Sequence, residues 1–255
     1  LAFSFHRGMD HAGAVIGPML AMIVLYYRPA NFRLVFRLAI LPAVAGVLVL
    51  MLAAREIPTP PRGPAPSFHL HQFDRSFKTY LITVFLFTLG NSSDAFLLLR
   101  AREVGISTAM IPALWLFHHL VKMVVSVPGS GLSDRIGRKR VIRMGWLVYA
   151  AVYVGFGLAQ QAWQIWLLFA VYSLYYGLTE GTEKAFVADL VRPDQRGTAF
   201  GIYNFAIAIG ALPASLIMGV LWHRASPLTA FLFGVAMALL AAIVLTGVKE
   251  HETVA

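Results

Sequence analysis

Eight predominantly apolar stretches, each close to the length of a membrane-spanning helix, make up most of this sequence. A helix needs about 20 mostly apolar residues to cross a bilayer. Backbone polar groups cannot stay unpaired in hydrocarbon, and the stretches lack the alternation of a membrane β-strand, so we expect helices and an all-α membrane protein. The eight stretches cover roughly residues 5–27, 32–54, 77–99, 109–127, 141–159, 165–185, 199–221 and 228–248.

The residue composition supports a membrane protein and excludes several other classes. Apolar residues make up 58% of the chain and charged residues only 13%, against roughly 25% charged residues in an ordinary soluble domain. The net charge of +9 comes from basic residues in short loops between apolar stretches, so we expect membrane lipids as partners and no nucleic acid. The lack of cysteine excludes disulfides and thiolate metal sites.

Signatures of catalysis are missing from the sequence. It contains no His-Glu-x-x-His zinc motif, no Gly-x-Ser-x-Gly elbow and no Gly-rich phosphate-binding loop. A membrane-embedded hydrolase is therefore only a remote alternative, and Lys184 beside Glu183 would repel a metal cation. We expect neither an enzyme nor a bound metal or cofactor.

A proline-rich segment divides the chain into unequal parts. Residues 55–76 cannot be helical throughout, because prolines break helices, and they should form a semi-rigid extended linker. Two apolar stretches precede the linker, within residues 1–54, and six follow it, within residues 77–255. The prolines of the linker are Pro58, Pro60, Pro61, Pro64 and Pro66.

Lysine and arginine are distributed unevenly between the two sides of the membrane. Thirteen lie on the side that holds both ends of the chain, the linker and the loop at 128–143, and six lie on the opposite side. Positive charge marks the cytoplasmic face, so we expect both termini to be cytoplasmic.

A weak internal repeat indicates how the chain is organised. The pairs Ala2-Phe3 and Gly13-Ala14 recur 197 residues later as Ala199-Phe200 and Gly210-Ala211, each time at the start of an apolar stretch. Parallel repeats of this kind occur in transporters. We expect two halves of six helices, with four helices of the first half preceding Leu1.

The loop at 128–143 carries the most specific motif. It contains Ser130-Gly131-Leu132-Ser133-Asp134-Arg135-Ile136-Gly137-Arg138-Lys139-Arg140. Gly131 and Gly137 would permit close helix approach and unusual backbone angles, and Asp134, after a helix end, could accept from Arg138. This loop resembles the signature loop of the major facilitator superfamily, which lies between the second and third helices of each half.

The resemblance implies the fold and the kind of activity. It implies the major facilitator superfamily fold, with eight of its twelve transmembrane helices (the fifth to the twelfth) present, and a secondary transporter that works by alternating access. Asp134, with Arg135, Arg138 and Lys139, would latch the two halves near Phe3–Arg7 in one state. The segment His11–Pro18 resembles a fifth-helix motif of exporters, which implies proton-coupled efflux of a small molecule across a bacterial inner membrane. A facilitator or a solute/proton symporter of the same fold remains an alternative.

The resemblance also places the cavity on the third and sixth stretches. Asn91 and Asp94 are three residues apart and should share a helix face, as should Glu180 and Glu183. Glu183 is the first candidate for the proton carrier because it shares a face with another carboxylate; Asp94 is the second and Glu180 the third. Glu180 should form an ion pair with Lys184, one turn away.

Four further polar residues are weaker candidates. A histidine in a span can carry protons, although it more often donates to a neighbouring helix. Arg7 and Asp10 could pair across a turn near the inner surface. His119 and Lys122, three residues apart in the fourth stretch, complete the set.

Overall fold

The computed structural model describes the backbone of residues 2–29, 31–53 and 70–249, and the side chains within them except those of 2–12 and 126–130. By packing, the chain forms two compact units, residues 1–67 with 107–116 and residues 68–106 with 117–255. Residues 55–69 of the predicted linker lie outside the described part of the chain. The rest of it differs from the extended linker predicted, because Leu70–Gln72 form a 3₁₀ turn and a helix begins at Arg75.

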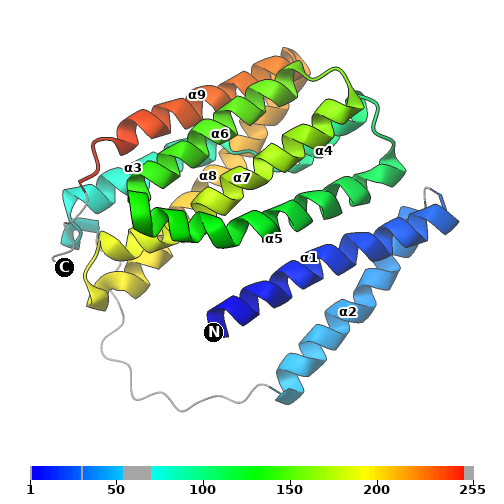
Figure 1. The fold of residues 1–255 in the computed structure, drawn as a ribbon, viewed down its shortest axis with the longest axis horizontal. Coiled ribbons are helices and arrows are strands. Elements are labelled where there is room, and N and C mark those ends of the chain that lie inside the picture. Colours follow the sequence, from blue (N-terminus) through cyan, green and yellow to red (C-terminus); the bar gives the residue numbers. More distant parts are fainter. Residues whose placement is uncertain (1, 30, 54–69, 250–255) are drawn as a thin grey trace. The chain divides into compact units, whose positions relative to one another are not determined.

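The first unit contains two long helices, α1 (Ala2–Tyr27) and α2 (Phe32–Ala53), joined by a short turn (Figure 1). Asn31 begins α2, where its Oδ1 accepts a hydrogen bond from the Leu34 amide at 3.1 Å and so satisfies a free helix-end donor. The mean hydropathy of α2 reaches 2.4, and none of its residues is buried. Its length and hydropathy suit a helix that crosses a membrane.

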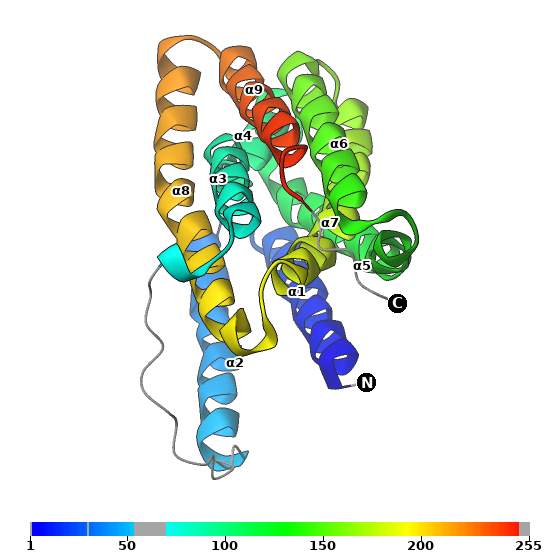
Figure 2. The same ribbon diagram turned by 90° about the vertical axis from the view of Figure 1, so that its left-hand side faces the viewer.

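The second unit is a bundle of helices. Helix α6 packs against α7 and α9, and α3 packs against α8 and α9, as Figure 2 shows from the side. Short 3₁₀ turns precede α3, α5 and α8. The helices are α3 (Arg75–Gly90), α4 (Ala95–Glu103), α5 (Ile111–Ile136, whose first residues, up to Leu116, belong to the first unit), α6 (Arg138–Leu158), α7 (Ala162–Asp189), α8 (Arg196–Arg224) and α9 (Pro227–Leu245).

Where the structure describes them, the predicted apolar stretches are helical over most of their length, which confirms an all-α membrane protein. Within the described residues, six segments are long and apolar enough to cross a membrane: 32–53, 75–103, 108–125, 138–158, 193–224 and 227–246. The apolar part of α1, Gly13–Tyr27, is shorter. Helix α7 is not among the six, and its second half carries the charged residues Glu180, Glu183 and Lys184.

The third stretch is not one helix, which corrects the sequence interpretation. Helix α3 ends at Gly90, residues Asn91–Ser93 are not helical, and α4 begins at Ala95, so Asn91 and Asp94 do not share a helix face. The break lies where two backbones touch, because a Cβ on Gly90 would stand 2.8 Å from the carbonyl oxygen of Gly234 on α9. The Tyr149 hydroxyl donates to the Gly90 carbonyl oxygen at 2.9 Å and satisfies one group that the break leaves free.

The predicted loop at 128–143 is also shorter than expected. Helix α5 continues to Ile136 and α6 begins at Arg138, so Asp134 lies in the last turn of α5 and does not follow a helix end. Gly137 joins the two helices with a φ of 92°, the unusual backbone conformation expected for it. Gly131 differs from expectation, since a Cβ there would meet no described atom within 4 Å, and α5 passes through this position without a close neighbour.

Candidate substrate cavity

A cavity of about 390 Å³ opens beside the break between α3 and α4, within the usual size range of about 300–1,000 Å³ for small-molecule sites. Residues of α3, α7 and α8 and of the break itself form its walls. No lysine, arginine or histidine is among the lining residues, whereas two carboxylates are. The lining residues are Val84, Phe87, Thr88, Asn91, Ser92, Ser93, Asp94, Tyr175, Tyr176, Glu183, Ile207, Ala211 and Ser215.

Glu183 joins three helices through neutral hydrogen-bond donors. Its Oε1 accepts from Trp146 Nε1 of α6 at 3.0 Å, and its Oε2 accepts from the Tyr203 hydroxyl of α8 at 3.0 Å. Its backbone carbonyl oxygen lies 3.4 Å from the donating hydroxyl of Tyr80 on α3. The indole nitrogen can only donate, whereas a tyrosine hydroxyl can donate or accept, so the two carboxylate oxygens are not equivalent.

Asp94, the last residue of the break, is held by two tyrosines of α7. The Tyr172 hydroxyl donates to Oδ1 at 2.7 Å, and the Tyr176 hydroxyl donates to Oδ2 at 3.2 Å. Asn91, at the other end of the break, donates from Nδ2 to the Tyr175 hydroxyl at 3.4 Å. The structure thus brings Asn91 and Asp94 to one cavity through partners on α7, although they are not neighbours on one helix.

The aromatic partners of these carboxylates were not predicted from the sequence. Phe87 stacks on Trp146 with ring centroids 4.7 Å apart, and Tyr149 stacks on Tyr153 at 4.0 Å. The sequence did contain a signal for them. Helices α6 and α7 both carry aromatic residues at spacings of three and four, which place these side chains on one helix face. These are Trp146, Tyr149 and Tyr153 on α6, and Tyr172, Tyr175 and Tyr176 on α7.

Glu180 has a partner from a different helix than the sequence suggested. Lys122 Nζ of α5 lies 3.0 Å from Glu180 Oε2 and 4.1 Å from the centroid of the Tyr176 ring. Lys184, the expected partner, has an exposed side chain. Glu180 therefore contacts α5, whereas Glu183, one turn further along the same helix, contacts α6 and α8.

Of the two adjacent histidines, His118 makes the clearest contact with another helix. It is buried, its Nδ1 lies 2.9 Å from Ser173 Oγ, and its ring stacks on Tyr172 at 5.5 Å. This arrangement matches a histidine that bonds a neighbouring helix. The sequence interpretation had selected His119, beside Lys122. The side chains of Arg7 and Asp10 lie outside the described residues.

The signature motif forms a second polar region, which we call the motif end: Asp134, Arg138, Lys139 and Asp189. Arg138 forms an ion pair with Asp189, and its guanidinium also lies 4.0 Å from Asp134 Oδ1. Lys139 Nζ donates to the backbone carbonyl oxygen of Val248 at 2.8 Å. The motif therefore ties the end of α5, the start of α6, the end of α7 and the segment after α9. Arg135 is exposed.

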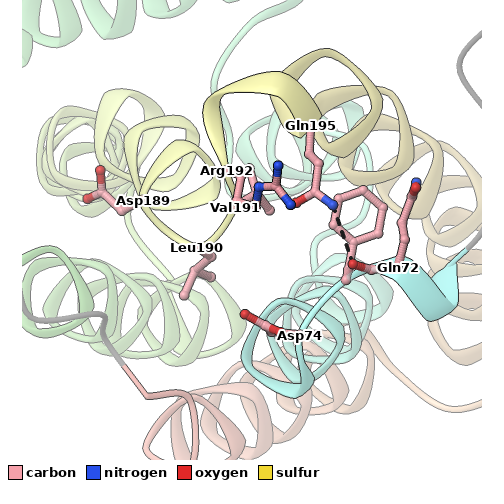
Figure 3. A pocket seen from close by; sticks show the side chains of 8 residues that line it. Gln72, Asp74, Asp189, Leu190, Val191, Arg192 and Gln195 are labelled. Carbon is pink, nitrogen blue, oxygen red and sulfur yellow. Dashed lines mark hydrogen bonds between the residues drawn. The ribbon is translucent and has the colours of Figure 1, made fainter.

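A shallow polar hollow of about 290 Å³ adjoins the motif end (Figure 3). Asp189 and Asp74 stand on different sides of it, and Gln195 Nε2 donates to the Gln72 carbonyl oxygen at 3.4 Å. Its walls come from the segment before α3 and the connection between α7 and α8. Phe73 is the one aromatic residue among those that line this hollow, whereas several aromatic residues line the cavity.

Comparison with known proteins places most of the chain in one family. A family profile described as the Major Facilitator Superfamily matches residues 79–255. An uncharacterised MFS-type transporter of Methanocaldococcus jannaschii is 33% identical over 252 residues, which is 95% of this chain and 62% of that protein. Multidrug resistance protein MdtH of Citrobacter koseri is 26% identical over 115 residues, or 45% of this chain and 29% of MdtH. MdtH of Cronobacter sakazakii is 28% identical over the same length.

Proposed function

The chain belongs to the major facilitator superfamily, and we propose that the protein containing it exports a small molecule by alternating access, driven by protons. The chain spans 62% of the archaeal relative and 29% of MdtH, so the activity of the whole protein is inferred. The name of MdtH supports export, and the carboxylate-lined cavity supports coupling to protons.

The observation that carries the proposal is the environment of Glu183. A proton-coupled transporter needs a carboxyl group that takes up and releases a proton in contact with the substrate cavity. Trp146 can only donate, so it keeps Oε1 as an acceptor, and an added proton belongs on Oε2. Tyr203 would then turn its hydroxyl to accept from Glu183. Protonation would thus reverse the direction of the hydrogen bond that joins α7 to α8. In this way the uptake of a proton would change a contact between two helices of the cavity wall.

Asp94 is the second candidate for the proton carrier and Glu180 the third. Asp94 lines the cavity, but both of its partners are tyrosines of a single helix. Glu180 pairs with Lys122, and an ion pair holds a carboxylate in its charged form. Glu183 alone links the cavity to donors from two neighbouring helices.

We expect Glu183→Gln, in the complete protein reconstituted in vesicles, to abolish transport driven by a pH gradient and to retain exchange driven by substrate concentration. Glutamine keeps the size and cannot cycle a proton. Asp194→Asn is the matched control, because Asp194 is an exposed carboxylate paired with exposed Arg192. If single Gln or Asn variants of Glu183, Asp94 and Glu180 all keep full gradient-driven transport, this part of the protein does not couple protons.

The proposal also includes orientation, with the motif end and both chain ends on the cytoplasmic side. The excess of lysine and arginine on that side supports it. Single cysteines at Gly105 and Gln161 should react with an impermeant thiol reagent added to intact cells, and one at Thr253 should not. The reverse pattern would contradict this orientation.

A further inference from the structure

We infer that the cavity beside the α3–α4 break takes an organic cation, an amine or quaternary ammonium group on an aromatic or aliphatic body, with Asp94 as its counter-ion. The inference rests on the proposed function in one respect, that this cavity is the substrate site. The charge of the cavity and the contacts of a resident ammonium group support it independently.

The first observation is the charge balance of the cavity. Asp94 and Glu183 both line it, and their oxygens are held by tyrosine and tryptophan donors that carry no charge. The cation on the neighbouring helix α5, Lys122, is already paired with Glu180 and is not among the lining residues. In a low-dielectric site such carboxylates favour a cationic ligand and oppose an anionic one.

The second observation is that the protein already binds an ammonium group next to the cavity. Lys122 Nζ lies against the face of Tyr176 at 4.1 Å and against the Glu180 carboxylate at 3.0 Å. The hydroxyl of the same Tyr176 donates to Asp94, inside the cavity. An aromatic face with a carboxylate beside it is the chemistry that recognises alkylammonium groups. The cavity repeats this pairing with Asp94 and the tyrosine rings of α7.

The test is direct binding of a charged probe to the complete purified protein. Benzyltrimethylammonium carries a quaternary ammonium on a benzyl group, and phenylmethanesulfonate carries an anion on the same group. We expect equilibrium dialysis to show saturable binding of the cation and none of the sulfonate. Asp94→Asn should weaken cation binding by about tenfold or more, the effect of losing one strong charge contact, while Asp194→Asn should leave it unchanged. Equal binding of both probes, no binding of the cation, or unchanged affinity in Asp94→Asn would overturn the inference.

A second measurement covers the case in which Asp94→Asn does not fold. Ser215 lines the cavity and the 255 residues of this chain contain no cysteine, so Ser215→Cys, with any cysteine elsewhere in the complete protein replaced by serine, provides a reporter thiol. Benzyltrimethylammonium should slow the reaction of this thiol with a maleimide at least severalfold, and the sulfonate should not; equal rates would count against the site. Neither binding test needs proton coupling. Binding without gradient-driven transport would defeat the proposed function alone, and gradient-driven transport of another substrate without binding would defeat this inference alone.

Discussion

The second unit contains two clusters of charged residues that are stabilised in opposite ways. At the motif end, carboxylates are paired with arginine and remain partly in contact with solvent, with Asp189 46% and Asp134 71% exposed. In the cavity, Glu183 and Asp94 have no ionic partner of this kind, and aromatic donors hold all four of their oxygens.

This difference indicates different work for the two clusters. Exposed ion pairs contribute about 0–1 kcal/mol and can form and break easily, which suits a contact that changes between conformations. A buried carboxylate with neutral donors keeps its charge available to a proton or a ligand, and removing one donor costs more. Predictions that separate the clusters follow, from the largest effect to the smallest.

The largest effect is expected at the close contact between the backbones of α3 and α9, which lies next to the break beside the cavity. In Gly234→Val, the new Cβ would lie 2.8 Å from the carbonyl oxygen of Gly90, and backbone atoms cannot move aside as a flexible side chain can. We expect a loss of at least about 3 kcal/mol of stability, measured as loss of monodisperse protein on heating in detergent. Gly219→Ala is the control, since its Cβ would have only an ordinary contact at 3.7 Å with Phe96. Equal stability of the two variants would mean that α3 and α9 do not meet at these glycines.

The next effect concerns the donors of Glu183. Trp146→Phe keeps an aromatic ring against Phe87 but removes the donor to Oε1, and Tyr203→Phe removes the donor to Oε2. Each change should cost about 1–3 kcal/mol of unfolding free energy, because it leaves a part-buried carboxylate oxygen without its donor. In a Glu183→Leu background the same changes should cost clearly less, since no acceptor remains. Equal costs in both backgrounds would show that the rings matter only through packing.

The sequence predicted the helices of this protein well and the cavity only in part. Helix positions follow from apolar length, which is a local property, and Gly137 could be assigned its unusual conformation from its residue type. The break at Asn91–Ser93 could not be assigned, because the backbone that lies beside it, Gly234 against Gly90, is distant in the sequence. Glu180 was given the wrong partner for the same reason, since Lys122 comes from another helix.

The motif end should show a smaller effect, in transport and not in folding. Asp134→Asn removes a charge that we propose latches the two halves of the transporter in one state. A contact of this kind is worth about 0.3–2 kcal/mol, enough to shift a near-balanced conformational equilibrium severalfold. We expect reduced transport at normal expression, with altered thiol accessibility of cavity position Ser215→Cys. Wild-type transport in Asp134→Asn would refute the latch.

The smallest effects allow a comparison within the exposed charges themselves. Arg138–Asp189 and Arg192–Asp194 join the same residue types, but Arg138 is 28% exposed and Arg192 is 75% exposed. Solvent and salt screen the second pair more strongly, and two exposed side chains lose more freedom on pairing. Double-mutant cycles on unfolding free energy should therefore give a coupling of about 1 kcal/mol for Arg138 with Asp189, and about 0.3 kcal/mol or less for Arg192 with Asp194.

Raising the salt concentration to about 1 M, where the Debye length is about 3 Å, should remove the second coupling and leave part of the first. If the two couplings are equal at low salt, partial burial adds nothing to Arg138–Asp189. The motif end would then hold its helices through backbone contacts such as that of Lys139 with Val248, and not through this ion pair.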